Sequence, residues 1–324
     1  MWVTFIIFVL AMLALDLGVF NRKAHVIKFK EAVGWSIFWI CLALLFNFYL
    51  FYKYPVNIGQ EFLAGYLLEK ALSVDNIFVF IMLFTYFQVD PKYQHRLLFW
   101  GIVGALVLRG AMIAAGAAII EFQIVVVFFG LLLIWTGYRM ATHDPTADDP
   151  TKSLVYRLAR KFLPFTEKDY GQKFMVQEDG KTKFTKLFLV LIIVETTDVL
   201  FALDSIPAVF AVTKDPFIVF TSNVFAILGL RALYFLLAGI MGIFRYLKYG
   251  LSIILIFVGV KMLLAHTAYK IPVSYSLMTI GAILSISILA SIFSAKRKDE
   301  EPVAALPGSE KTDDEDHEPE LPPK

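Results

Sequence analysis

The sequence predicts an all-α fold, a polytopic bundle of transmembrane helices with about nine spans. Of its 324 residues, 58% are hydrophobic and only 18% are charged, whereas soluble domains average about 45–50% apolar and about 25% charged residues. Nine apolar runs approach or exceed the ~20 residues that a helix needs to cross the hydrocarbon. These runs are too long and continuous for barrel strands, so helices are the remaining way to satisfy the backbone in lipid.

The nine runs define the predicted helices in chain order. They cover residues 1–21, 33–53, 61–87, 97–119, 123–141, 187–212, 217–241, 246–265 and 274–295. The first run lacks the basic start and small-residue cleavage site of a signal peptide, and it contains Asp16. We therefore interpret it as a retained membrane helix.

Lysine and arginine are distributed unequally between the two sides of this nine-helix arrangement. The loops and adjoining helix ends of one side hold 21 of them, and those of the other side hold three, Lys53, Lys214 and Lys270. Cytoplasmic loops carry the excess of basic residues. The split predicts an external N-terminus and a cytoplasmic C-terminus.

The long cytoplasmic loop, residues 142–186, contains two predicted elements. Basic and apolar residues alternate with helical spacing from Ser153 to Phe165, as in an interfacial helix. Between residues 173 and 186, Asp179-Gly180 is typical of the turn of a β-hairpin. Beyond the transmembrane domain, which we assign to residues 1–295, the acidic and proline-rich residues 296–324 predict a disordered cytoplasmic tail.

An internal repeat relates two parts of the membrane domain. Asp75-Asn76-Ile77 matches Asp204-Ser205-Ile206, and this alignment sets Glu69 opposite Asp198. Further matches join Leu108-Arg109 to Leu230-Arg231, and Gly137-x-Arg139-Met140 to Gly259-x-Lys261-Met262. Each repeat, residues 61–141 and residues 187–265, contains three predicted helices, so the second copy enters the membrane from the opposite side. Inverted repeats of this kind are typical of transporters, whose substrate sites lie near the bilayer midplane.

Acidic residues within the predicted helices are the strongest candidates for a functional site. The six acids are Asp16, Glu69, Asp75, Glu195, Asp198 and Asp204. Each charge at a helix centre opposes insertion by ~2.5–3.5 kcal/mol, so these acids must be protonated, paired or bound to a cation. Neighbouring oxygen donors are Asn76 and Ser205, with Asn223 as a further candidate, and the predicted counter-ions are Arg109 and Arg231. Lys70 and Lys261 are expected to extend their amines towards a membrane interface.

Pro207 follows Asp204 by three residues in the sixth predicted helix. A proline cannot donate to the carbonyl four residues earlier, here that of Leu203, and its ring pushes that carbonyl away. We therefore expect the helix to kink or open near Asp204 and to free a carbonyl for a cation. The repeat further predicts that Asp75 and Asp204 face one another near the bilayer centre.

The ligand types limit the choice of ion. The five histidines fall in predicted loops, in the tail or at a helix end, and the single cysteine, Cys41, excludes an intramolecular disulfide or a cysteine-rich metal site. Oxygen ligands suit Mg, Ca and Mn, whereas Zn and Cu usually recruit His or Cys. The residues alone leave Mn2+ and Ca2+ both open.

Three segments resemble the TerC family of integral membrane proteins, and most closely its manganese-exporting members. They are Glu69-Lys-Ala-Leu-Ser73-Val-Asp75-Asn76-Ile-Phe-Val-Phe, Asp204-Ser205-Ile206-Pro207-Ala208 and Phe225-Ala-Ile-Leu-Gly-Leu-Arg231-Ala-Leu-Tyr-Phe-Leu-Leu-Ala-Gly239. The resemblance covers roughly residues 1–295 and implies a multi-pass protein of the bacterial inner membrane that exports Mn2+. It carries the family's acidic residues over to Glu69, Asp75, Glu195, Asp198 and Asp204, and also to Asp16 in the first helix. The family name derives from tellurium resistance, which keeps an oxyanion-related role open.

Two other classes of function compete with transport. Asp75 and Asp204 could form an intramembrane aspartyl protease, but the sequence has neither a Gly-x-Gly-Asp motif nor an HExxH motif, and we expect no enzyme. A membrane scaffold or stress-resistance factor without transport would use the loop and the tail to bind partner proteins. The net charge of +2 gives no case for nucleic acid. The expected partners are a divalent ion and the bilayer, with no resident cofactor, and the sequence leaves the oligomeric state and the coupling ion open.

Overall fold

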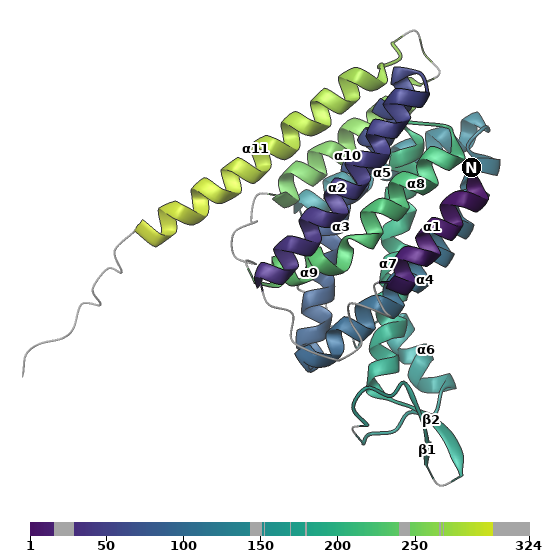
Figure 1. The fold of residues 1–324 in the computed structure, drawn as a ribbon, viewed down its shortest axis with the longest axis vertical. Coiled ribbons are helices and arrows are strands. Elements are labelled where there is room, and N and C mark those ends of the chain that lie inside the picture. Colours follow the sequence, from purple (N-terminus) through teal and green to yellow (C-terminus); the bar gives the residue numbers. More distant parts are fainter. Residues whose placement is uncertain are drawn as a thin grey trace, which may run out of the picture.

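The computed structural model describes residues 1–15, 29–142, 151, 153–168, 170–178, 180–239, 247–265, 267 and 269–300. In chain order (Figure 1) its elements are α1 (Trp2–Leu15), α2 (Phe29–Lys53), α3 (Val56–Tyr86), α4 (Pro91–Ile119), α5 (Gln123–Thr142), α6 (Leu154–Phe162), β1 (Met175–Glu178), β2 (Lys181–Phe184), α7 (Lys186–Phe210), α8 (Pro216–Leu228), α9 (Leu230–Ala238), α10 (Leu247–Leu264) and α11 (Val273–Glu300). The α-helical membrane fold is confirmed. Asp16, predicted as a site residue, lies outside the described residues.

Five of the described helices are long and apolar enough to cross a membrane: α2, α4, α5, α10 and α11. The bent pair of α8 and α9 makes a sixth if it is one span. The helices α3 and α7 have 31 and 25 residues, but three or more charged residues fall in every membrane-length stretch of each. The number of nine spans therefore stays a prediction.

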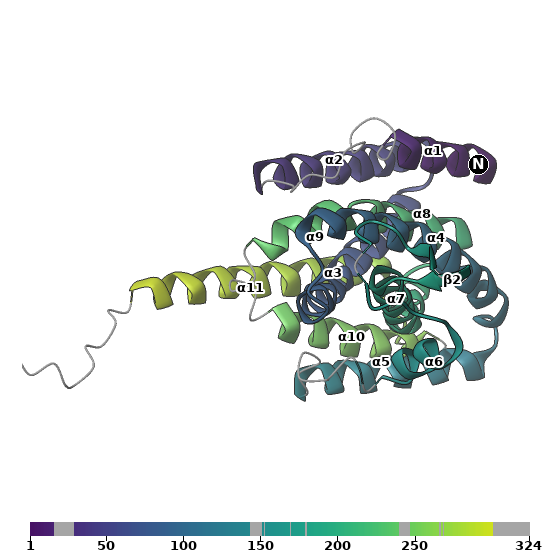
Figure 2. The same cartoon turned by 90° about the horizontal axis from the view of Figure 1, so that it is seen from below.

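The helices form layers around the acid-bearing pair. Figure 2 shows α1 and α2 on one face and α5 with α10 on the opposite face, with α3 and α7 between them. The outer helices expose large apolar side chains, including Phe48 on α2, Phe128 on α5 and Phe293 on α11, as lipid contact requires. By contrast, residues 221–228 of α8 are all buried. Glu69 of α3 and Asp198 of α7 are thus held in the interior of the bundle.

The interrupted helix is the predicted seventh helix rather than the sixth. The prediction of one helix over residues 217–241 was wrong, because α8 and α9 meet at Gly229 with a bend of 41°. Lys70 Nζ donates to the carbonyl of Ala226 at 3.4 Å, so its cation lies at the C-terminal end of α8, where carbonyls lack helical partners. A Cβ on Gly229 would lie 2.8 Å from Lys70 Nζ and 3.2 Å from the Cβ of Trp39, so a larger residue at the break would displace the lysine amine.

Pro207 does not open the helix that contains it. The α-helix α7 continues from Lys186 to Phe210 through Asp204 and Pro207, so the expected opening near Asp204 was wrong, and the alternative expectation, a kink, stays a prediction. Both Pro207 and the three residues that follow it are buried. Packing around this end of α7 therefore keeps the helix intact despite the lost hydrogen bond.

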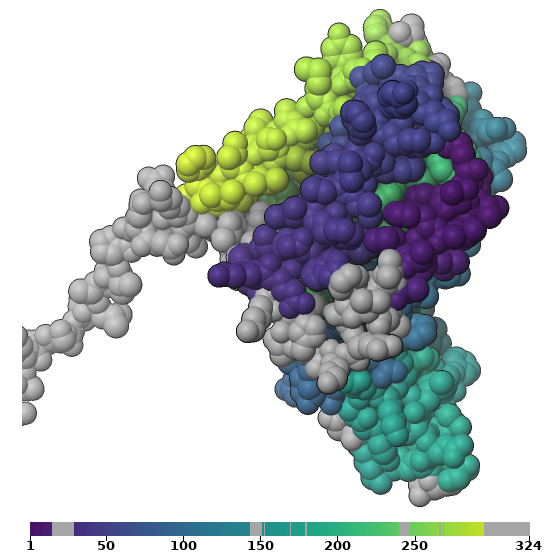
Figure 3. Space-filling model, viewed as in Figure 1, coloured from purple at the N-terminus to yellow at the C-terminus, as the bar shows by residue number. Residues whose placement is uncertain are grey.

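The loop between α5 and α7 contains the two elements that its sequence predicts, and it projects from one end of the bundle in Figure 3. Ser153 caps α6 by accepting from the amide of Tyr156 at 3.2 Å. The strands β1 and β2 pair in antiparallel fashion, and Gly180 has φ +71° in the turn between them. Glu178 pairs with Lys168 at 2.8 Å and with Lys183 at 3.2 Å. Hydrogen bonds from Lys168, Thr166 and Lys183 lower the pKa of the Glu178 carboxyl from 4.5 to about 2.

The helices α4 and α8, the second helices of the two predicted repeats, begin in the same way. Asp90 precedes Pro91 and accepts from the amide of Lys92 at 3.0 Å, and Asp215 precedes Pro216 and accepts from the amide of Phe217 at 2.8 Å. A side-chain acceptor at the N-cap and a proline at the first helical position both favour helix initiation. The last helix, α11, extends to Glu300, five residues into the segment predicted as disordered tail. Residues 301–324 of that tail lie outside the described residues.

Candidate functional site

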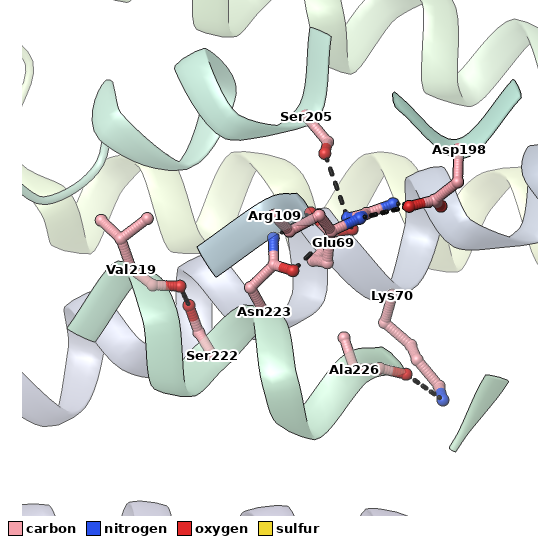
Figure 4. A network of polar contacts seen from close by, with 9 residues as sticks. All are labelled: Glu69, Lys70, Arg109, Asp198, Ser205, Val219, Ser222, Asn223 and Ala226. Atoms are coloured by element: carbon pink, nitrogen blue, oxygen red, sulfur yellow. Dashed lines mark hydrogen bonds and ion pairs between the residues drawn. The ribbon is translucent and has the colours of Figure 1, made fainter. Parts of the chain in front are cut away.

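Arg109 of α4 lies at the centre of a buried ionic cluster (Figure 4). Its Nε and Nη2 donate to the two carboxylate oxygens of Asp198 on α7, at 2.9 and 2.8 Å. Its Nη1 forms an ion pair with Glu69 of α3. Arg109 is 2% exposed, Asp198 is 4% exposed and Glu69 is fully buried. One guanidinium therefore ties three helices together at the core of the bundle, in the bidentate geometry that arginine favours with carboxylates.

Two neutral side chains complete this cluster. Asn223 of α8 donates from Nδ2 to Glu69 at 3.0 Å and accepts from Arg109 Nη1 at 3.4 Å. Ser205 of α7 accepts from the same Nη1 at 3.4 Å. Ser205 and Asn223, both candidate oxygen ligands, thus contact the guanidinium that pairs with Glu69 and Asp198. With two carboxylates and one guanidinium, the ionised cluster has a formal charge of −1.

Glu195 adds a further carboxylate one helical turn before Asp198. Its Oε2 is buried and has no hydrogen-bond partner among the described residues, and the charge of Asp198 acts on it. The carboxylate packs directly over Gly104 of α4, where an added Cβ would overlap it. A buried carboxylate oxygen without a partner is unfavourable, so this position is suited to hold a proton or a cation.

Asp204 and Asp75 lie further along α7 and α3. Asp204 is half-buried and accepts from Thr136 Oγ1 of α5 at 3.0 Å. Asp75 is also half-buried, and its neighbour Asn76 is buried. Within the described part of the chain, no group of three or more His, Cys, Asp or Glu side chains is arranged to hold a metal ion. A shared site between Asp75 and Asp204 therefore stays a prediction.

The second predicted counter-ion, Arg231, lies against a histidine. Arg231 of α9 is 5% exposed, and its Nη1 lies 3.0 Å from Nε2 of His95, which is 8% exposed. His95 sits in the second turn of α4, so it is a buried imidazole near the start of that helix. The repeat alignment sets Arg109 opposite Arg231, and both are buried, but it did not reveal the contact of Arg231 with His95.

Sequence reasoning missed three residues that shape the site: Gly104, Thr136 and His95. Gly104 occurs in an apolar helix, and only its close approach to Glu195 distinguishes it from other helical glycines. Thr136 is one hydroxyl among apolar neighbours. For His95 a signal existed, since it follows the cap residue Asp90 by five positions and so falls inside α4 rather than before it.

These features define a polytopic α-helical membrane protein with a buried cluster of acids around one arginine. The family model described as "Integral membrane protein TerC family" matches residues 54–299. The chain therefore belongs to the TerC family, as its motifs indicated. No solved structure matches the chain.

Several bacterial proteins resemble this chain over most of their length. An "Uncharacterized membrane protein STKORF319" from Myxococcus xanthus is 50% identical over 297 residues, which cover 91% of this chain and 93% of that protein. A protein of Escherichia coli (strain K12) named "Putative membrane-bound redox modulator Alx" is 44% identical over 312 residues, covering 93% and 97% of the two chains. A protein from Photorhabdus laumondii with the same name is also 44% identical over 312 residues, covering 92% and 96%. The family match over residues 54–299 includes α3 and α7, which carry Glu69, Asp75, Glu195, Asp198 and Asp204.

Proposed function

We propose that this protein exports a divalent cation, Mn2+ by preference, across the bacterial inner membrane through its buried carboxylates. The observation that carries the proposal is the excess of acid around Arg109. Glu69 and Asp198 share one guanidinium, and Glu195, one helical turn before Asp198, has a buried Oε2 without a hydrogen-bond partner among the described residues. A net negative charge inside a membrane bundle is unfavourable unless protons or a cation balance it.

The ligand chemistry favours a hard cation. The candidate ligands beside the excess charge are carboxylate oxygens, an amide oxygen and a hydroxyl, from Glu195, Asn223 and Ser205 among others. Such donors suit Mg, Ca and Mn rather than Cu or Zn. The preference for Mn2+ rests on the resemblance to the manganese-exporting members of the TerC family.

In this proposal, Asp204 with Thr136 and Asp75 with Asn76 lie on the path of the ion next to the arginine cluster. A carboxylate can release a proton when a cation binds and recover it afterwards, so an exchange of protons for metal is compatible with these groups. Arg109 holds Glu69 and Asp198 in place between α3, α4 and α7. The reaction is movement of an ion without covalent chemistry, so we propose a transporter rather than an enzyme.

Packing between α5 and α10 supports the inverted repeat on which the transport model rests. A Cβ on Gly259 would lie 2.7 Å from the carbonyl oxygen of Gly130, and a Cβ on Gly137 would lie 2.8 Å from that of Ser252. The offset of 122 residues that aligns Gly137 with Gly259 also aligns Gly130 with Ser252. Exchanging the repeats therefore converts one contact into the other, as a two-fold axis in the membrane plane requires.

The contacts among the other repeat helices follow the same relation. The helix α3 packs on α8, and α4 packs on α7, and these two pairs interchange when the repeats are exchanged. The matching Asp-Pro starts of α4 and α8 are a further correspondence. Nine spans with an external N-terminus remain our model of the topology.

The experiment that tests the function measures Mn2+ movement directly. Purified protein in liposomes is expected to move Mn2+, whereas Asp75→Asn and Asp204→Asn, which keep size but remove charge, are expected to lose most of the flux. Glu121→Gln, at an exposed acid between α4 and α5, is the matched control and should retain flux. Wild-type liposomes without Mn2+ movement would contradict transport and favour the scaffold alternative. A direct ion measurement is needed because the name of the Alx relatives describes a redox effect and no ion.

The topology has a test of its own. Reporter fusions at Pro150 and at the C-terminus are expected to report the cytoplasm, and fusions near Pro216 are expected to report the outside. A cytoplasmic report near Pro216 would contradict both the nine spans and the inversion of the repeat.

A further inference from the structure

A cavity with three lysines in its lining lies at the end of the bundle where α7 and α10 finish and where α3 and α11 begin. Its volume is about 310 Å³. Its charged and polar lining consists of Glu61, Thr213, Lys214, Lys261 and Lys270, and the remainder is mostly apolar. We call it the lysine pocket. It is separate from the cluster around Arg109, and none of the acids assigned to the transport site lines it.

The lysine pocket concentrates positive charge where the protein has little. The side of the bundle predicted to face outward has only three loop lysines, and two of them, Lys214 and Lys270, line this one cavity. Both are exposed. The third lysine of the pocket, Lys261, comes from the last turn of α10. With Glu61, the pocket has a formal charge of +2, so its preference is for an anion.

Lys261 gives the pocket a buried anchor. The residue is only 6% exposed, and its Nζ is buried without a hydrogen-bond partner among the described residues. The amine is therefore enclosed by protein, and the expectation that it extends towards a membrane interface stays a prediction. The carbonyls of its own last helical turn do not satisfy it either. A buried ammonium group without a partner is unfavourable unless a ligand supplies the missing acceptors.

The carboxylate in the wall does not fill that role. Glu61 Oε2 accepts from Thr213 Oγ1 at 2.5 Å, and its Oε1 faces Asn57 Nδ2 at 3.5 Å. Glu61 forms no ion pair within 4 Å of Lys261 among the described contacts, although the charges of Glu61 and Lys270 both act on Lys261. The three lysines line one cavity of about 310 Å³, so this space can hold a ligand that supplies oxygen acceptors.

We propose that the lysine pocket binds one phosphate group, with Lys261 as the buried contact and Lys214 and Lys270 as the exposed contacts. Lysines bind phosphate as point charges, and basic pockets between membrane helices bind the phosphates of lipid head groups. The phosphate comes either from free inorganic phosphate or from an anionic phospholipid, for which the apolar wall with Val126 and Met262 offers contact. The proposal does not depend on metal transport.

The test uses full-length protein in detergent with two probes. Inorganic phosphate is titrated at constant ionic strength, with the thermal midpoint as the readout, and phosphatidylglycerol is titrated by native mass spectrometry, with diacylglycerol as the phosphate-free control. Saturable binding of phosphate alone assigns the free ion, and binding of phosphatidylglycerol alone assigns the lipid. If neither probe saturates, the proposal is wrong.

Variants then locate the binding. Lys261→Met is expected to weaken it at least tenfold and Lys270→Gln about threefold, whereas Lys53→Gln, at the third outer lysine, which stacks on Tyr49 rather than lining the pocket, leaves it unchanged. Wild-type affinity in both pocket variants, or an equal loss in Lys53→Gln, would overturn the assignment. If Lys261→Met does not fold, Lys270→Gln decides alone, because its side chain is exposed and its removal leaves the bundle intact.

Discussion

Two ionic clusters of this protein use the same pairing chemistry in opposite surroundings. In the bundle, Arg109 lies between Glu69 and Asp198, with side chains that are 3%, 0% and 5% exposed. In the loop, Glu178 lies between Lys168 and Lys183, and the Lys168 side chain is 72% exposed. The buried cluster has two acids for one base, and the loop cluster has two bases for one acid.

Burial decides what each arrangement does. Water solvates the exposed charges of the loop cluster and weakens its ion pairs. The loop cluster therefore serves mainly to hold the hairpin in place. The buried cluster has no such solvent, and its excess negative charge must be balanced by something that binds. The comparison therefore assigns structure to the loop cluster and ion handling to the buried one.

The largest expected effect comes from removing Arg109. Arg109→Gln leaves Glu69 and Asp198 buried together without a cation, and loss of one member of a buried pair destabilises by about 3–5 kcal/mol. Thermal unfolding in detergent should show this loss, whereas Arg160→Gln on the exposed surface of α6 should leave the midpoint near that of the wild type. Adding Glu69→Gln to Arg109→Gln should restore part of the stability, because it removes an unpaired charge. If Arg109→Gln were as stable as the wild type, burial would not distinguish the two clusters.

A smaller effect is expected from filling the space beneath Glu195. Gly104→Ala places a methyl group where the Glu195 carboxylate lies, and overpacking of this kind destabilises by roughly 1–3 kcal/mol. Because the carboxylate is displaced, Mn2+ flux should fall more than stability does. Gly281→Ala is the control, since nothing lies within 4 Å of its added Cβ. Equal flux in the two variants would mean that the position of Glu195 is unimportant.

The smallest effect belongs to the loop cluster. Hydrogen bonds in the folded state stabilise the ionised form of Glu178. Its contribution to the folding stability is therefore present above the unfolded pKa of 4.5 and is lost as the pH falls through about 2. At neutral pH, Glu178→Gln should speed amide hydrogen exchange in β1 and β2 and leave Mn2+ flux unchanged. Loss of flux in this variant would show that the loop cluster also takes part in function.

Much of the architecture was predictable because helices that cross a membrane need long apolar runs, which are visible in the sequence. Apolar runs of membrane length located the helices of the bundle, and the Asp179-Gly180 turn located the hairpin. The pairing of Arg109 with buried acids followed from the rarity of charges in such runs. Local sequence rules did not locate the helix break. The helix α7 stays continuous through Pro207, whereas α8 and α9 are separated at Gly229, where Lys70 donates to a carbonyl at the end of α8.

The remainder of the site depends on contacts between segments far apart in the chain. Gly104 matters because α7 places Glu195 against it, and Thr136 matters because α5 passes Asp204. No spacing rule within one helix encodes these distances. The contact of Arg231 with His95 could not be inferred for the same reason, since His95 comes from the other repeat.

The most direct test of the central claim measures Mn2+ binding to the buried acids. Electron paramagnetic resonance of Mn2+ titrated into purified protein should reveal a saturable site. Glu195→Gln should weaken this site at least tenfold, a free-energy change of ~1.4 kcal/mol or more, and Glu121→Gln should not. Equal affinity in wild type and Glu195→Gln, or the absence of saturable binding in the wild type, would contradict the assignment of the acid cluster as the ion site.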